Sequence, residues 1–146
     1  MSDFVDFGSL PDEVTWRGAS VLAQDVRGRV LMQLRDSDAG LASPGKWGLF
    51  GGGVEPGESL DAAARREFHE ETGIDIAAEA LRPLARFRSQ AMASGIVHVF
   101  ALDRRVVRED VRLAEGAGFA FLTREQVGHF DLIEAFRTVL QAPDLW

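Results

Sequence analysis

Three glutamates, Glu67, Glu70 and Glu71, stand close together near the middle of the chain. Residues three and four apart share one side of a helix, where like charges repel by roughly 0.2–0.5 kcal/mol per pair. A bound cation would offset this repulsion. Mg²⁺ suits the group because it is a hard ion that takes carboxylate oxygens and shares its coordination with substrate phosphates. The cluster therefore predicts a magnesium site, with Mn²⁺ as a substitute, and phosphoryl chemistry.

The residues around the cluster predict a helix over 60–72. Ser59 can accept hydrogen bonds from the free amides of the first turn, Asp61 complements the positive helix end, and Gly73 supplies the C-terminal stop. An apolar stripe at four-residue spacing, suited to packing on a core, consists of Leu60, Ala64 and Phe68. One side of the helix is thus expected to pack while its neighbour binds.

The segment before the helix is rich in glycine and proline, at Gly51, Gly52, Gly53, Pro56 and Gly57. Such residues permit a backbone that turns sharply and approaches a ligand closely. This segment is therefore expected to form the approach to the acidic cluster.

Together, this loop and helix resemble the Nudix box, G-x5-E-x7-R-E-U-x-E-E-x-G-U, where U is an apolar residue. Every fixed position is filled, by Gly52, Glu58, Arg66, Glu67, Phe68, Glu70, Glu71, Gly73 and Ile74. The resemblance implies an α+β Nudix fold, in which a mixed β-sheet is sandwiched between α-helices. Many Nudix chains carry Pro-Gly-Gly at the box entrance, whereas this chain has Phe50 before its two glycines. This difference leaves the loop less rigid and does not exclude activity.

By this resemblance the metal ligands are Glu67, Glu70 and Glu71. Arg66 would orient the catalytic glutamate, and Glu58 would support the helix behind the ligands. Such an enzyme cleaves a phosphoanhydride bond by attack of water on phosphorus, with little covalent work for the protein.

Further candidates lie outside the helix. Glu115 precedes a predicted strand, where Nudix enzymes often add a metal-binding or basic glutamate; a solvated loop residue is the alternative. Gly51 matches a glycine whose carbonyl commonly binds metal. Arg35 is either a phosphate contact or half of an ion pair. Trp47 and Phe50 either stack on a base or sugar or belong to the core.

Composition narrows the class of protein. The chain has 146 residues, a net charge of −7 and no cysteine, which suits one domain without disulfides or a cysteine zinc site. A general nucleic-acid surface needs dense Lys and Arg and is not expected. Neither a transmembrane run nor a secretion leader stands out, so we expect a cytoplasmic protein without membrane contacts.

Periodic patterns outline the rest of the chain. Apolar stretches predict strands at 19–24, 30–35, 47–50, 82–88, 95–102 and 118–122, and the nearly continuous apolar run in 95–102 is typical of a buried strand. Thr123 with Gln126 predicts a capped short helix, and Asp131 is expected to cap the last one. A single Nudix domain would then span 17–146. The arm 1–16 either packs against this body or forms the interface of a homodimer.

The substrate expected from the resemblance is a small nucleotide. Signals of several Nudix subgroups are absent: the chain has no tyrosine, and it lacks the asparagine with which oxidised-purine hydrolases often read the base. A nucleoside triphosphate or a nucleoside diphosphate derivative remains. The alternatives are a silent nucleotide-binding or regulatory module and, less consistent with the acidic charge, an RNA-processing enzyme.

Overall fold

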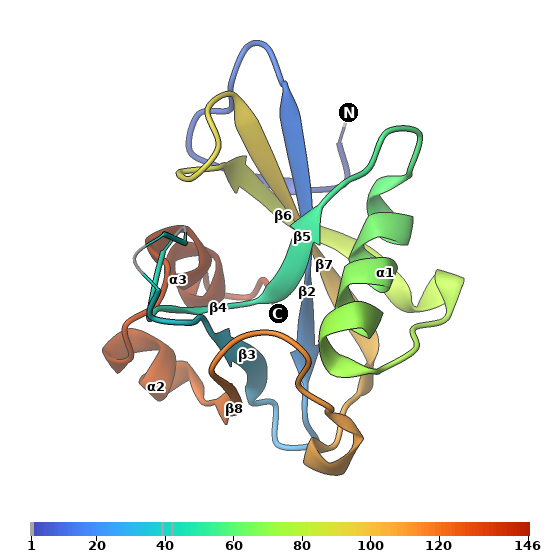
Figure 1. Cartoon of the computed structure of the whole chain (residues 1–146), viewed down its shortest axis with the longest axis vertical. Coiled ribbons are helices and arrows are strands. Elements are labelled where there is room, and N and C mark those ends of the chain that lie inside the picture. The colour runs from blue at the N-terminus through green and yellow to red at the C-terminus, as the bar shows by residue number, and fades with distance from the viewer. Residues whose placement is uncertain (1, 39, 42) are drawn as a thin grey trace.

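The computed structural model describes residues 2–38, 40–41 and 43–146. Eight strands form one mixed sheet, flanked by helices on both faces (Figure 1). The strands are β1 (Val5–Phe7), β2 (Trp16–Gln24), β3 (Val30–Leu34), β4 (Trp47–Gly48), β5 (Phe50–Gly53), β6 (Leu81–Arg88), β7 (Gly95–Arg105) and β8 (Gly118–Leu122). The helices are α1 (Leu60–Thr72), α2 (Arg124–His129) and α3 (Glu134–Gln141), with single 3₁₀ turns η1 (Ala78–Ala80) and η2 (Arg108–Asp110). The expected α+β sandwich is confirmed.

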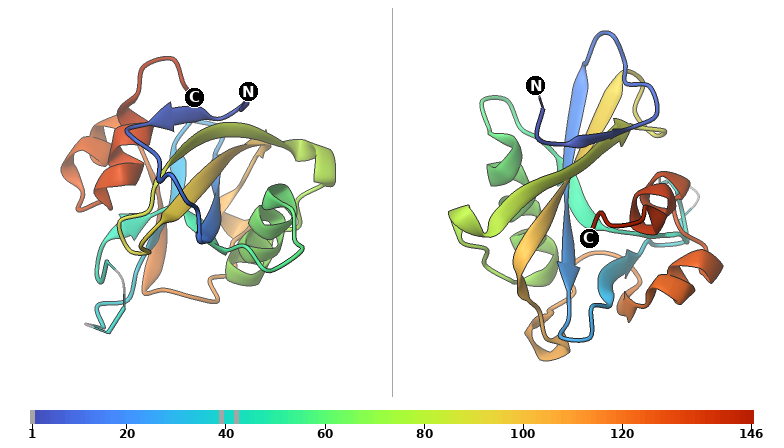
Figure 2. Two further views of the ribbon diagram at one scale, coloured as in Figure 1. Left: turned by 90° about the horizontal axis from the view of Figure 1, so that it is seen from above. Right: turned by 180° about the vertical axis from the view of Figure 1, so that it is seen from behind.

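Strand β2 lies at the centre of the sheet. It runs parallel to β7 and antiparallel to β3 and β5, and the main path of the sheet is β1-β6-β7-β2-β3-β4. Its side chains alternate between the faces: Ala19, Val21 and Ala23 pack with helix α1, while Leu22 packs with α2 and α3. The sheet therefore separates two apolar cores, and Figure 2 shows α1 on one side of it and α2 with α3 on the other.

Helix α1 has the bounds that its local signals predict. The Ser59 hydroxyl accepts a hydrogen bond from the Ala62 N–H, and Gly73 adopts the left-handed conformation, with φ of 76°, that ends the helix. The predicted stripe packs in the core: Ala64 and Phe68 are fully buried, and Leu60 lies against the same cluster. This packing fixes which side of α1 faces outward.

The last two helices agree with the sequence only in part. Thr123 and Gln126 form the expected capping box of α2. The prediction that Asp131 caps α3 is wrong, because α3 begins after Ile133 and has no side-chain cap. The backbone at 131–133 instead pairs with Trp47: the Trp47 N–H donates to the Asp131 carbonyl, and the Ile133 N–H donates to the Trp47 carbonyl, each at 2.9 Å.

The described part of the N-terminal arm packs against the body. Strand β1 pairs in parallel with β6 at the edge of the sheet, and the Phe4 ring packs edge-on against the rings of His98 and Phe100. Trp16 already belongs to β2. Among the described residues, no helix has the length and apolar character needed to cross a bilayer.

Candidate active site

Arg66 ties helix α1 to the glycine-rich loop that precedes it. Its Nε and Nη2 donate to the two Glu58 carboxylate oxygens at 2.8 and 2.9 Å, and Nη2 also donates to the Gly53 carbonyl at 3.0 Å. The hydrogen bonds from Arg66, with one from the Glu55 N–H, lower the pKa of Glu58 to about 2. Glu58 therefore stays ionised and holds the guanidinium against the loop.

The remaining guanidinium nitrogen faces the acidic cluster. Nη1 donates to Glu67 Oε1 at 3.0 Å, and it lies 3.4 Å from each carboxylate oxygen of Glu70. Bonds to Glu58 and Glu67 raise the pKa of Arg66, so the charge persists. The structure thus places Arg66 where it can orient Glu67, as the resemblance implies, while the Glu70 side chain is 54% exposed at the outer edge.

Glu71 is the buried member of the cluster, with only 4% of the residue exposed. Its Oε1 has no hydrogen-bond partner among the described residues. Burial, and then the carboxylates of Glu115 and Glu67, raise the pKa of Glu71 to about 8, although the Gly51 backbone N–H opposes them by a smaller amount. The unpaired oxygen and the raised pKa together indicate that this buried carboxyl lacks a positive partner.

Glu67 occupies space left open by a glycine. A Cβ atom added to Gly52 would lie 2.4 Å from the Glu67 Cδ and 2.6 Å from both carboxylate oxygens, closer than real contacts allow. Burial also raises the pKa of Glu67, against the lowering effect of Arg66. The box glycine is therefore required because the strand and the carboxylate touch.

Glu115 comes to the same cluster from a distant part of the chain. Its loop joins η2 to β8 and arcs toward the end of α1 (Figure 1). The residue is exposed, yet its carboxyl is near enough to raise the pKa of both Glu71 and Glu67. The Glu115 carboxyl therefore lies near the box glutamates and adds another negative charge beside an unpaired buried oxygen.

The chemistry of these donors fits a hard divalent cation. Several carboxylates gather with no opposing charge on Glu71, and hard cations prefer such oxygens. Within the ranges that the structure describes, no three His, Cys, Asp or Glu side chains already converge on one point suited to an ion. In this arrangement Arg66 Nη1 donates to Glu67 at 3.0 Å and lies 3.4 Å from the Glu70 carboxylate oxygens.

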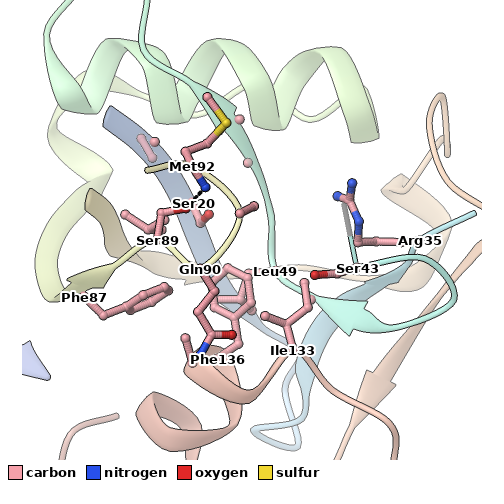
Figure 3. A pocket seen from close by; sticks show the side chains of 18 of the residues that line it. Ser20, Arg35, Ser43, Leu49, Phe87, Ser89, Gln90, Met92, Ile133 and Phe136 are labelled. Carbon is pink, nitrogen blue, oxygen red and sulfur yellow. Dashed lines mark hydrogen bonds between the residues drawn. The ribbon is translucent and has the colours of Figure 1, made fainter. Parts of the chain in front are cut away.

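A pocket of about 290 Å³ adjoins the cluster. It lies between the sheet, the start of α3 and the loop that joins β6 to β7, and Figure 3 shows Phe87, Ile133 and Phe136 around its apolar part. Gly51 and Gly52 belong to its wall. Because the Gly51 N–H faces Glu71 and Gly52 touches Glu67, strand β5 is shared between the pocket and the carboxylates.

The other predicted substrate residues are divided by the structure. Arg35 lines the pocket. Trp47 is half-buried and packs on Phe130 outside the pocket lining, with ring centroids 5.8 Å apart. Phe50 is fully buried and packs on Phe68 beneath helix α1. Phe50 therefore has no exposed ring for stacking; of the two alternatives, this geometry is that of a core residue.

Sequence reasoning missed the polar residues of the pocket floor. Ser20 and Gln33 are 5% and 4% exposed and line the pocket from β2 and β3. The available signal was one polar side chain within each of two otherwise apolar stretches, 19–23 and 30–34. Buried polar groups require partners, so each is a candidate for function.

Comparisons with known proteins agree with this fold. The NUDIX domain family matches residues 14–141. The nucleoside triphosphatase NudI of Enterobacter sp. strain 638 is 36% identical over 119 residues, covering 75% of this chain and 84% of that protein. The protein of the same name from Escherichia coli O81 is 33% identical over 111 residues, covering 70% and 79%.

Solved structures give the same result. The MutT protein from Methanosarcina mazei Go1 matches with a TM-score of 0.74 and 29% identity, covering 91% of this chain and 94% of that one. The Escherichia coli ORF135 protein shares the fold, with a TM-score of 0.71 at 22% identity, covering 92% of each chain. With the family match over most of its length and the complete box on α1, the chain belongs to the MutT-like Nudix hydrolase family.

Proposed function

We propose that this protein is a Mg²⁺-dependent pyrophosphohydrolase that cleaves a phosphoanhydride bond of a nucleoside triphosphate. One observation carries the proposal: the pocket and the carboxylate cluster share the strand segment Gly51 to Gly52. A nucleoside in the pocket would extend its phosphates along this strand toward the glutamates. The relatives named nucleoside triphosphatase support this substrate class over a nucleoside diphosphate derivative.

The proposed ligands of Mg²⁺ are the carboxylates of Glu67, Glu70, Glu71 and Glu115 with the carbonyl of Gly51. When bound, the ion would neutralise charge on the phosphates and lower the pKa of a coordinated water. The unpaired Oε1 of buried Glu71 supports this assignment, because such an oxygen calls for a positive partner. Mn²⁺ is proposed as a substitute.

The remaining site residues have positioning and binding roles in this proposal. Arg66 orients Glu67 and is itself held by Glu58. Arg35 contacts a phosphate from the pocket wall. Water attacks phosphorus in line, the new P–O bond forms as the anhydride P–O bond breaks, and the proton of the water passes to a carboxylate of the cluster.

Further proposals concern the whole molecule. We propose a single Nudix domain over 17–146 preceded by the arm 1–16, a cytoplasmic location, and a free nucleotide as the partner in place of nucleic acid or membrane. A homodimer also remains a prediction.

A nucleotide panel tests the proposal. The four ribonucleoside and four deoxynucleoside triphosphates would be incubated with Mg²⁺, and phosphate would be measured with and without added inorganic pyrophosphatase. We expect phosphate to appear only, or mainly, with pyrophosphatase, since cleavage between the α- and β-phosphates releases pyrophosphate. The Glu71→Gln variant is the matched control for contaminating activity.

The same panel separates the enzyme from the silent module. Nucleotide binding by calorimetry without phosphate release, at saturating Mg²⁺ and Mn²⁺, would favour a binding or regulatory protein. If the protein neither bound nor hydrolysed any nucleotide, both the enzyme and the binding-module interpretations would be overturned.

A further inference from the structure

The loop that carries Glu115 is attached at both ends by backbone hydrogen bonds. On one side, the Arg112 and Ala114 N–H groups donate to the carbonyls at the end of α1, those of Thr72 and Glu71, at 2.8 and 3.0 Å. On the other side, the Ala117 N–H donates to the Leu34 carbonyl at the end of β3, at 2.9 Å. These bonds leave Glu115 between two anchored points.

Gln33 holds the loop at Glu115, between these two anchored points. Its side chain is almost completely buried on β3, and its Nε2 donates to the Glu115 backbone carbonyl at 2.9 Å. Because a carbonyl only accepts, the amide must present its nitrogen here. The bond joins residues 82 positions apart in the sequence, so it is a tertiary contact rather than a local turn.

Gly116 allows this contact to be close. It has a φ of 96°, which is accessible to glycine, and an added Cβ would lie 2.9 Å from both Gln33 Nε2 and the Leu34 carbonyl. The loop is therefore shaped to lie against the Gln33 amide. A side chain at 116 would push it away.

Gln33 also belongs to the wall of the pocket. One buried amide thus contacts the space proposed for the nucleoside and, through the Glu115 carbonyl, the segment that brings a carboxyl to Glu71. Side chains anchored in a strand position a loop more accurately than loop contacts do. A link of this kind lets the pocket wall and the acidic cluster keep one relative position.

We propose that Gln33 is a positioning residue for the hydrolytic reaction, which holds Glu115 beside Glu71 from the wall of the substrate pocket. This inference rests on the proposed function, since the reaction gives Glu115 its role. The competing interpretation is a buried glutamine that merely satisfies a loop carbonyl and contributes only to stability.

Gln33→Met tests the proposal, because methionine keeps the length of the side chain and loses the donor. We expect kcat to fall about tenfold, the effect of losing one hydrogen bond of typical strength, and KM to stay within about twofold. Gln24→Met is the matched control: Gln24 Nε2 donates to a loop carbonyl, that of Gly28, at 3.1 Å, remote from the pocket and cluster. It should leave both constants within about twofold.

A double-mutant cycle with Glu115→Gln decides how Gln33 acts. If Gln33 acts through Glu115, adding Gln33→Met to Glu115→Gln should change kcat by less than about twofold. If the two effects multiply, or if Gln33→Met changes KM alone, Gln33 contacts substrate independently and the positioning role is overturned.

Hydrogen exchange supplies a measurement that needs no turnover. In Gln33→Met, amides of residues 114–117 should exchange at least about tenfold faster, while those within α1 remain as in the wild type. Unchanged exchange in 114–117 would refute the proposal. If the wild type hydrolysed no nucleotide, the proposed function would fail while this measurement still decided whether Gln33 holds the loop. Should Gln33→Met fail to fold, Gln33→Leu, which is smaller, apolar and without a donor, replaces it.

Discussion

Replacing Glu71 by glutamine should stabilise the metal-free protein while removing its activity. Glutamine has nearly the shape of glutamate but carries no charge, so it avoids the cost of ionising a buried carboxyl. The Glu71 backbone carbonyl would still accept its bond from the Ala114 N–H. The substitution therefore isolates the charge.

The size of the effect follows from the pKa. Burial, together with the neighbouring carboxylates of Glu115 and Glu67, raises the pKa of Glu71 from 4.5 to about 8. A raised pKa means that folding favours the protonated form, so this contribution to stability is complete below pH 4.5 and is lost as the pH rises toward 8. At pH 7 the loss covers 2.5 pH units, or about 3.4 kcal/mol at roughly 1.36 kcal/mol per unit; at pH 5 it is about 0.7 kcal/mol.

The assay is denaturant unfolding in EDTA at pH 5, 6, 7 and 8. The difference in unfolding free energy between Glu71→Gln and wild type should grow from about 1 kcal/mol at pH 5 to about 3 kcal/mol at pH 7. Glu70→Gln is the control, because its half-exposed side chain should change stability by less than about 0.5 kcal/mol. Millimolar Mg²⁺ should then stabilise the wild type more than the Glu71→Gln variant.

Two results would refute this reasoning. The first is a Glu71→Gln variant that is less stable than wild type at pH 7 in EDTA, which would mean that the carboxylate has a stabilising partner. The second is a difference that does not change between pH 5 and pH 7, which would mean that Glu71 does not titrate in this range.

Four more predictions concern the proposed site. Glu70→Gln should lower turnover by roughly 10² or more with an unchanged circular dichroism spectrum, because it removes a metal ligand; turnover near wild type at saturating Mg²⁺ would remove Glu70 from the site. Mg²⁺ or Mn²⁺ should raise the melting temperature, because an ion at a hundredfold excess over its Kd adds about 2.7 kcal/mol to the free energy of unfolding. A thermal-shift titration that shows no response to either ion, with nucleotide present, would count against a metal site. Glu115→Gln should lower kcat with little change in KM, whereas a solvated loop residue would leave both within about twofold in steady-state kinetics. Gly52→Ala should abolish most activity, since its Cβ would displace the Glu67 carboxylate, while Gly118→Ala, whose Cβ meets nothing within 4 Å, should remain active; equal activity of the two would show that Glu67 need not lie against the strand.

Local signals were enough for the helix that carries the chemistry. The bounds of α1 follow from Ser59 and Gly73, each of which acts on backbone groups within four residues. The capping box of α2 is equally local. The Nudix box then indicated the family and the acidic cluster, because its residues lie in one continuous segment that runs from the end of β5 through a loop into α1.

Predictions that depended on partners elsewhere in the chain were less secure. Asp131 is of a residue type that commonly caps helices, yet its backbone pairs with Trp47, more than 80 residues earlier in the chain. Phe50 precedes three glycines, which have no side chains to show which face of the strand is buried. Only its packing on Phe68 places it in the core.

By itself, then, the sequence determined the acidic helix, its approach loop, the family and the reaction class, since short-range hydrogen bonding and residue spacing encode all of these. The tertiary structure decided that β5 is shared by the pocket and the carboxylates, that Glu115 joins Glu71, and that Gln33 holds the Glu115 loop from the pocket wall. Such contacts join residues tens of positions apart. They arise from the order of strands in the sheet and from side-chain packing, which no local pattern specifies.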